Sequence, residues 1–199
     1  MKKLIIGILC LFAVTSAQAQ WGSGTGSKDF SFGPRAAFGV SNILTDGEAA
    51  DWKFSFAVGG FANLRLAKGF YLHPELNFAM KGAKHITKVP IIGTEIVSTT
   101  SLSYIEIPVL AKLSMGSASI LAGPYFGVLV ASDYSISDNS TDLLKPDYET
   151  LDIGIAGGVE VTLPSNFTAE FRANYGFTEI IKDGKSKNLS LAIGIAYHL

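Results

Sequence analysis

Apolar and polar residues alternate along most of this chain, and the alternation is clearest over residues 103–113. Every second residue from Ile105 to Leu113 is apolar, whereas the positions between them include Glu106 and Lys112. Successive side chains of a β-strand point to opposite faces, so a period of two predicts a strand. One face of this strand carries no polar side chain, and the other carries a carboxylate and an ammonium group.

Seven other segments repeat this pattern, which gives eight predicted strands of roughly ten residues or more. These segments are 30–42, 52–66, 70–82, 119–134, 151–163, 167–178 and 188–199. A tilted strand needs roughly 9–11 residues to cross a bilayer, so these lengths suit transmembrane strands. No window holds 18 uninterrupted apolar residues, as a transmembrane helix would require. The pattern therefore predicts an all-β fold, an eight-stranded antiparallel up-and-down transmembrane β-barrel.

The connections between the predicted strands alternate between long and short. The long ones are 43–51, 83–102, 133–150 and 179–187, and the short ones are 67–68, 114–118 and 164–165. Outer-membrane barrels combine short periplasmic turns with longer external loops, and this parity then places both termini in the periplasm. Residues 83–102 are rich in β-branched side chains, so we expect a hairpin that prolongs its two strands and turns near Ile92 and Gly93.

Aromatic residues are placed near both ends of the predicted strands. Phe30, Phe32, Phe70, Phe167 and Tyr197 fall near one end, and Trp52, Phe54, Phe78, Tyr175 and Phe177 fall near the other. Aromatic girdles at the two membrane interfaces are typical of transmembrane barrels. The two sets support the barrel when they are taken together with the periodicity and the connection lengths.

The first 19 residues have the pattern of an export signal. Lys2 and Lys3 precede an apolar run, and Ala17 and Ala19 form a small-x-small cleavage site. We expect residues 1–19 to be removed, residues 20–29 to form a flexible leader, and residues 30–199 to form the barrel. Cys10, the only cysteine of the 199 residues, lies in the apolar run, so no disulfide is expected. The formal net charge of -1 gives no basic footprint for nucleic acid.

Charged residues lie on the face of the strands opposite the apolar one. They are Arg35, Lys53, Arg65, Glu75, Lys81, Glu106, Lys112, Asp152, Glu160, Glu170 and Arg172. Six cations and five anions are close to balance, which favours a paired network because an isolated charge in a narrow interior is strongly disfavoured. The interior of eight strands is only wide enough for side chains to fill, so we expect a closed lumen.

Residues suited to catalysis or to metal binding are scarce. His73, His85 and His198 are widely spaced, and no Ser/His/Asp arrangement stands out. We therefore expect no enzymatic activity, no metal and no cofactor, since a claim of catalysis must rest on the geometry of a site. The connection 133–150 carries five acidic residues and one lysine, which is typical of a solvated loop and also suits cation bridging to lipopolysaccharide.

Several motifs resemble those of a known family. They are Tyr104-Ile-Glu-Ile-Pro-Val-Leu-Ala-Lys112, Gly123-Pro-Tyr-Phe-Gly127, Asp152-Ile-Gly-Ile-Ala-Gly157, Glu170-Phe-Arg-Ala-Asn-Tyr-Gly176 and the closing Leu191-Ala-Ile-Gly-Ile-Ala-Tyr-His-Leu199. The chain is similar over nearly its whole predicted mature length to the PorT-type outer-membrane β-barrel domain of the Bacteroidota, often labelled porin-family. The resemblance implies a bacterial outer-membrane location but no single activity.

Three functions stay open at this point. The first is a structural or interaction protein whose external loops serve adhesion, envelope integrity or a secretion system, with outer-membrane lipid, lipopolysaccharide and envelope or secretion-system proteins as partners. The second is porin-like passage of small solutes or ions, which planar-bilayer conductance would detect. The third is an exported soluble ligand-binding barrel of the lipocalin type, which requires an apolar interior and a polar exterior.

Overall fold

The computed structural model describes residues 29–45, 48–89, 94–136, 139–140, 147–181 and 186–199. The predicted signal and all but one residue of the predicted leader lie outside these ranges, as does the predicted turn at Ile92 and Gly93. In the part of the chain that is described, no helix is long and apolar enough to cross a membrane.

Ten strands make up the described fold. They are β1 (Phe30–Thr45), β2 (Glu48–Ala49), β3 (Asp51–Ala67), β4 (Phe70–Val89), β5 (Thr94–Met115), β6 (Ala118–Ile136), β7 (Asn139–Ser140), β8 (Leu151–Thr162), β9 (Phe167–Gly176) and β10 (Ser186–Tyr197). The two-residue strands β2 and β7 pair with the last residues of β1 and β6. The eight long strands coincide with the eight predicted ones, so this prediction is confirmed.

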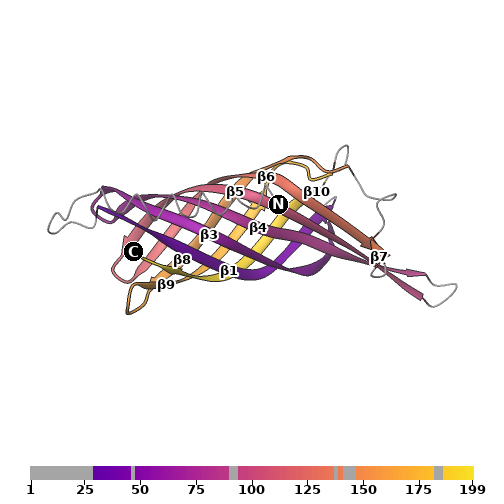
Figure 1. Ribbon diagram of the computed structural model, residues 1–199, viewed down its shortest axis with the longest axis horizontal. Helices are drawn as coiled ribbons and strands as arrows, with labels where there is room; N and C mark the ends of the chain where they lie inside the picture. The colour runs from indigo at the N-terminus through magenta and orange to yellow at the C-terminus, as the bar shows by residue number, and fades with distance from the viewer. Residues whose placement is uncertain (1–28, 46–47, 90–93, 137–138, 141–146, 182–185) are drawn as a thin grey trace, which may run out of the picture.

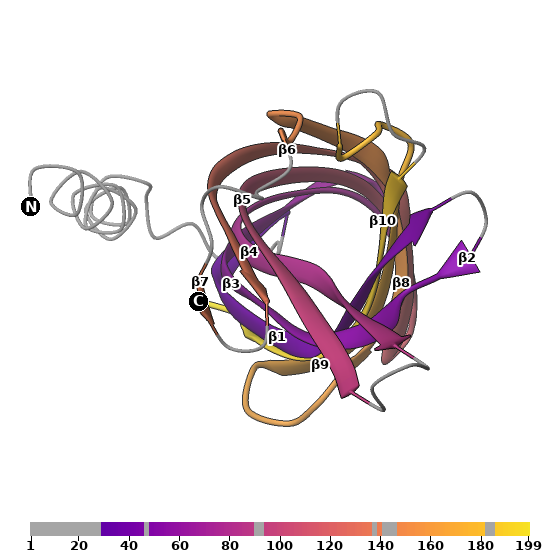
Figure 2. The ribbon, with the colours of Figure 1, turned by 90° about the vertical axis from the view of Figure 1, so that its right-hand side faces the viewer.

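The eight long strands form one closed antiparallel sheet in chain order. Each pairs with the next along the chain, and β10 returns to pair with β1 from Arg35 opposite Ala196 to Thr45 opposite Ser186. Figures 1 and 2 show the resulting barrel from the side and from one end. Closure leaves no free sheet edge along the body of the barrel, which satisfies the backbone polar groups within the sheet.

The two ends of the barrel differ in their connections. We call the end that carries the start of β1 and the end of β10 the terminal end, and the opposite one the loop end. Tight turns join strands at the terminal end, where Gly69, Gly116, Ser165 and Asn166 have positive φ. At the loop end β4 and β5 stay paired as far as Val89 opposite Thr94. The predicted hairpin, which prolongs these two strands beyond residues 82 and 103, is confirmed to that point.

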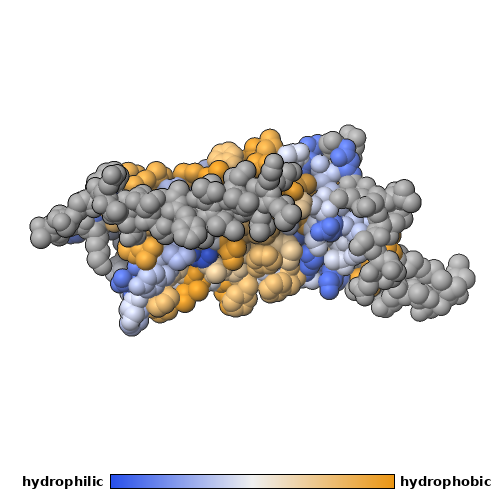
Figure 3. Space-filling view, viewed as in Figure 1, coloured by the Kyte–Doolittle hydropathy of each residue, from blue (hydrophilic) through white to orange (hydrophobic). Residues whose placement is uncertain are grey.

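The outer surface of the barrel is apolar over its middle. Exposed residues follow the predicted face of each strand, as in Phe38, Val58, Ile107, Phe126 and Ile193. Figure 3 shows apolar side chains gathered over the middle of the visible face and hydrophilic residues toward the loop end at the right. A large exposed apolar surface is typical of a protein that contacts lipid.

Outward-facing aromatic rings meet in pairs near both ends. Phe30 lies 5.5 Å from Phe32, and Phe167 lies 5.0 Å from Tyr197, as ring-centroid distances near the terminal end. Toward the loop end the rings of Tyr175 and Phe177 are 5.7 Å apart. These pairs fall in the two predicted girdles.

Candidate functional site: the charged lumen

Ten of the eleven charged residues predicted to point inward are buried, with exposed fractions between 2% and 9%. They are Arg35, Lys53, Glu75, Lys81, Glu106, Lys112, Asp152, Glu160, Glu170 and Arg172. The prediction for Arg65 is wrong. Its side chain is exposed at the terminal end and pairs with Asp29 at 3.2 Å, because β3 has by then reached the rim of the barrel and its register with β4 shifts after Arg65. Five cations and five anions therefore line the interior.

Six of the buried residues form one ion-pair cluster in the half of the lumen nearer the terminal end. We call Arg35, Glu75, Lys112, Glu160, Glu170 and Arg172 the terminal-half network. It contains three cations and three anions from five different strands, β1, β4, β5, β8 and β9. Since neighbouring strands are held by the barrel's hydrogen bonds, these side chains are positioned by the register rather than by flexible loops.

The two arginines of the terminal-half network are shared between carboxylates. Arg35 binds Glu75 at 3.2 Å and also contacts Glu170. Arg172 lies 2.9 Å from Glu75, 3.2 Å from Glu170 and 3.9 Å from Glu160. Glu160 and Glu170 stand directly opposite each other on β8 and β9, a repulsive arrangement for like charges that Arg172 bridges. The guanidinium group suits this role because it donates several hydrogen bonds in a fixed plane.

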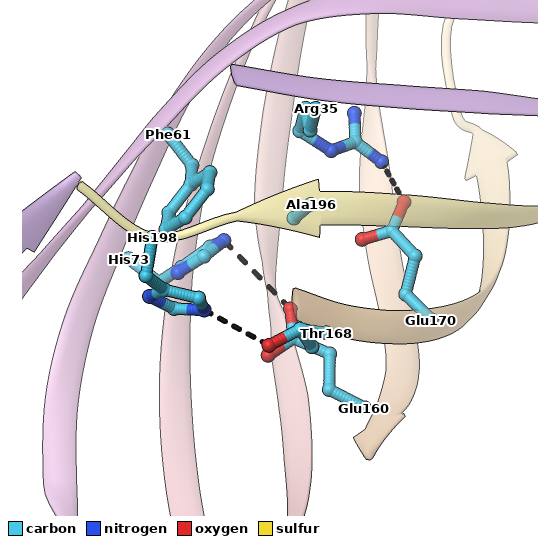
Figure 4. Close-up of a pocket in the computed structure, with 8 residues that line it drawn as sticks. All are labelled: Arg35, Phe61, His73, Glu160, Thr168, Glu170, Ala196 and His198. Carbon is cyan, nitrogen blue, oxygen red and sulfur yellow. Dashed lines mark hydrogen bonds and ion pairs between the residues drawn. The ribbon is translucent and has the colours of Figure 1, made fainter. Parts of the chain in front are cut away.

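Two histidines complete the polar layer on the terminal side of this network. His73 Nε2 lies 3.0 Å from Glu75 and its Nδ1 lies 2.7 Å from Asn63, while His198 Nε2 lies 2.9 Å from Thr168. The Phe61 ring stacks on His73 and meets His198 edge-on, at centroid distances of 5.3 Å and 4.9 Å. Figure 4 shows the three rings together, with the contacts of the two histidines running to Thr168 and Glu160. Side chains leave no room there for a water molecule.

A second cluster lies in the half of the lumen nearer the loop end, and we call Lys81, Glu106 and Asp152 the loop-half network. Lys81 Nζ is 2.5 Å from Glu106 and 3.5 Å from Asp152. The same ammonium lies over the Tyr125 ring, 4.6 Å from its centroid, where a cation–π attraction adds to the ion pairs. Two carboxylates thus share one lysine.

Neutral donors complete the environment of Asp152. The Tyr125 hydroxyl donates to one oxygen at 3.1 Å, and the Asn188 amide donates to the other at 2.8 Å. Glycines leave the space for these groups. A side chain at Gly154 would meet the Tyr125 ring at 2.6 Å, and one at Gly176 would meet Asp152 at 2.7 Å. Close packing against Tyr125 therefore explains the glycine at the third position of the Asp152-Ile-Gly motif.

Apolar residues pack together on the loop side of this network. Ile43, Ala83, Leu102, Tyr104, Tyr148 and Ile180 form a buried cluster, which we call the apolar cap. Tyr148 and Ile180 belong to connections rather than to long strands, and Glu149 N–H donates to the Ile180 carbonyl at 2.8 Å to join the two connections. Burial raises the pKa of the Tyr148 phenol, so this group stays neutral in the cap.

Lys53 stands apart from both networks. Its ammonium donates to Ser101 Oγ at 2.7 Å near the loop end, and no ion pair joins it to another of the predicted residues. Sequence reasoning also left out His73, Asn188 and Tyr104, which alternation places inward but which carry no fixed charge. Tyr148 and Ile180 follow no strand periodicity, so no signal in the sequence would have placed them over the lumen.

Both networks pair the buried charges that they contain. Each of the five buried carboxylates named above has a cation within 4.0 Å, and such pairing offsets part of the cost of taking charges out of water. Among the described residues, no group of three or more His, Cys, Asp or Glu side chains is arranged to hold a metal ion.

Comparison with known proteins agrees with this architecture. A family model described as an outer membrane protein beta-barrel domain matches residues 17–182. Neisserial surface protein A matches with a TM-score of 0.57 and 11% identity, over 86% of this chain and 98% of that one. Ail, the attachment invasion locus protein of Yersinia pestis, solved with the heparin analogue sucrose octasulfate, matches with a TM-score of 0.50 and 11% identity, over 86% and 99%. At such identity these likenesses show the fold alone, and no curated protein matches the sequence.

Proposed function

Because the chain belongs to the outer membrane protein beta-barrel domain family, we propose that it is a closed-lumen barrel whose loop end interacts with partners outside the cell. The observation that carries the proposal is an interior lined by buried, paired charged side chains. Two ion-pair networks fill successive levels of the lumen, and the apolar cap lies above them. The interior of an eight-stranded barrel offers little more than the volume of its side chains. A protein built in this way acts through its exposed ends.

The proposed orientation has the terminal end in the periplasm and the loop end outside. Its support is the difference between the ends, since the turns at the terminal end are tight and those at the loop end belong to longer connections and projecting strands. Bacterial barrels with an even number of strands have short periplasmic turns and longer external loops. The external connections then include the acidic segment 133–150.

Lipid and lipopolysaccharide are the proposed surroundings of the outer face. Its exposed Phe, Ile, Leu and Val side chains support this, while the charged residues point inward. These faces are the reverse of those in a lipocalin-like soluble barrel, which would be apolar inside and polar outside. The soluble alternative is therefore not retained.

Within this proposal, the interaction of the loop end serves adhesion, envelope integrity or association with a secretion system. The support for this part is the resemblance of the Tyr104–Lys112 motif and its companions to PorT-type proteins of the Bacteroidota, together with the ion-pair networks and the apolar cap that occupy the interior. Porin-like passage is the competing function, and it requires a path through both networks and the cap.

An epitope experiment tests the orientation. A short tag inserted after Asp142 should bind antibody on intact cells, whereas the same tag in the turn at Gly116 should bind only after the outer membrane is opened. The reverse labelling would overturn the proposed orientation. The two insertions control for each other because both lie in connections between strands.

Crosslinking on intact cells tests the interaction role. The matched control is a variant in which residues 141–146 are deleted, which leaves every described strand intact. We expect the full-length barrel to crosslink an envelope or extracellular partner that the shortened barrel loses, while both keep heat-modifiable migration in gels. Identical crosslinks from the two proteins would contradict a role for this connection.

A further inference from the structure

Backbone pairing between neighbouring long strands is interrupted at three places in the described sheet without a change of register. The missing pairs join 62–63 to 73–74 between β3 and β4, 75–76 to 107–108 between β4 and β5, and 109–110 to 123–124 between β5 and β6. The three interruptions adjoin one another along β4 and β5. They therefore form one continuous band across four strands, which we call the seam.

Each interruption contains a proline. Pro74, Pro108 and Pro124 belong to the missing pairs on β4, β5 and β6. Proline has no N–H to donate to the next strand, so it is rare in the middle of a sheet. In contrast, Pro34 opposite Gly60 leaves the β1–β3 ladder unbroken. The strands β8, β9 and β10 contain no proline, and their described ladders run from the first pair to the last without a missing pair.

The seam lies in the part of the wall that faces lipid. Two of its residues, Leu76 and Ile107, are 54% and 47% exposed on the apolar outer surface. Hydrocarbon cannot replace a backbone hydrogen bond, so strands with a complete ladder are held together strongly in a membrane. At the seam these bonds are already missing, and separating the strands there breaks fewer of them. Side-chain packing holds the wall together at this place.

A buried apolar cluster lies directly behind the β5–β6 part of the seam. Its members have exposed fractions of 0–1% and are Leu110, Leu121, Tyr125 and Ala156. Tyr125 stands opposite Pro108 on β5. Ala156 stands opposite Gly123, which belongs to the seam. Apolar side chains therefore line the inner side of the wall where the β5–β6 ladder is interrupted.

We infer that the β5–β6 part of the seam is a lateral opening of the barrel wall, which admits a lipid acyl chain to this apolar cluster. The apolar outer surface places hydrocarbon against the seam, and a chain that enters between β5 and β6 stays in apolar surroundings. The other two interruptions are backed by the polar side chains of Glu75 and His73, which disfavour such a chain. The inference goes beyond the proposed function and holds for either orientation of the barrel.

Photocrosslinking from the bilayer tests the opening in the wild-type barrel. The barrel is folded into vesicles of a phospholipid that carries a photoactivatable diazirine in one acyl chain. Mass spectrometry of the irradiated protein then locates the adducts. We expect adducts on the inward residues Leu110 and Leu121 as well as on the outward Ile107. Adducts confined to outward residues would overturn the inference.

Two proline variants test whether the seam is responsible. Pro124→Ala supplies the missing N–H of the β5–β6 ladder and should lower the yield of inward adducts at least about tenfold, because a completed ladder opens less often. Pro34→Ala, in the unbroken β1–β3 ladder, is the matched control and should leave the yield unchanged. Adducts on Ile107 need no opening and should be equal in all three proteins. Inward adducts that persist at full yield in folded Pro124→Ala would contradict the inference.

Hydrogen exchange gives a readout that needs no variant. Residues 107–110 of the seam should exchange their amide hydrogens at least about tenfold faster than residues 155–158 of β8, which are paired on both sides, since exchange follows local opening. Equal protection of the two segments would also overturn the inference. The seam lies in the wall of the barrel, so neither outcome depends on the tag experiment that tests the orientation.

Discussion

The two halves of the lumen pair their buried charges in different ways. In the terminal-half network three cations face three anions, and Glu75 and Glu170 each touch both arginines. In the loop-half network one lysine serves two carboxylates, and tyrosine and asparagine donors complete the set around Asp152. The first arrangement is redundant and the second depends on Lys81. Removing single charges should therefore have unequal effects in the two halves.

Lys81→Met should give the largest effect. Among the described residues, Lys81 is the only cation within 4.0 Å of Glu106 or Asp152, so its loss leaves two buried carboxylates uncompensated. Breaking a buried pair in this way costs roughly 3–5 kcal/mol of unfolding free energy. Urea unfolding in lipid vesicles measures the cost, and Lys84→Met, an exposed lysine on the same strand, is the matched control. A midpoint equal to that of Lys84→Met would mean that the loop-half network does not depend on Lys81.

Lys112→Met should cost less, although the lysine is equally an ion-pair partner. Lys112 lies 2.5 Å from Glu160, but Glu160 keeps Arg172 at 3.9 Å after the substitution. We expect a loss of roughly 1–3 kcal/mol, the range for a buried acceptor that loses one of its partners. The same urea series measures it. A cost as large as that of Lys81→Met would remove the distinction between the redundant and the dependent network.

Asn188→Ala measures how much a neutral hydrogen-bond donor, as distinct from an ion pair, stabilises the loop-half network. Its amide donates to Asp152 at 2.8 Å, while Lys81 and Tyr125 remain on the same carboxylate. The expected loss is roughly 1–2 kcal/mol, below that of Lys81→Met. If the alanine variant unfolds together with Lys81→Met, hydrogen bonds rather than the ion pair hold Asp152.

Arg65→Ala should have the smallest effect. Arg65 pairs with Asp29 at the terminal rim, where the side chains are 37% and 64% exposed. Exposed pairs contribute roughly 0–1 kcal/mol, so unfolding should hardly change. A large destabilisation would show that Arg65 belongs to the interior after all. The urea midpoint of this variant is the reference for the midpoints of the variants at buried positions.

Alternation along the strands predicted the barrel, the faces of its strands and ten of the eleven interior charges. The reason is that a period of two fixes orientation wherever a strand is regular and one face must be apolar. The same rule failed at Arg65, because parity does not say where a strand leaves the barrel. It also does not say which charges meet. Arg172 reaches carboxylates on β4, β8 and β9, and this follows from tilt and closure rather than from any local pattern.

The apolar cap shows a second limit. Leu102 and Ala83 extend the inward faces of β5 and β4, so alternation accounts for them. Tyr148 and Ile180 come from connections whose path over the lumen depends on contacts with each other. Those contacts are long-range in sequence and have no periodic signature. Alternation could therefore not predict the two residues that the connections add to the apolar cap.

The central claim is that the lumen is closed, and planar-bilayer recording of the purified wild-type barrel tests it most directly. Both networks and the apolar cap lie across the path that an ion would take. The account predicts no steady single-channel current from protein that is folded by heat-modifiable migration. Steady single-channel steps that scale with the amount of folded barrel would contradict it, and would favour porin-like passage instead.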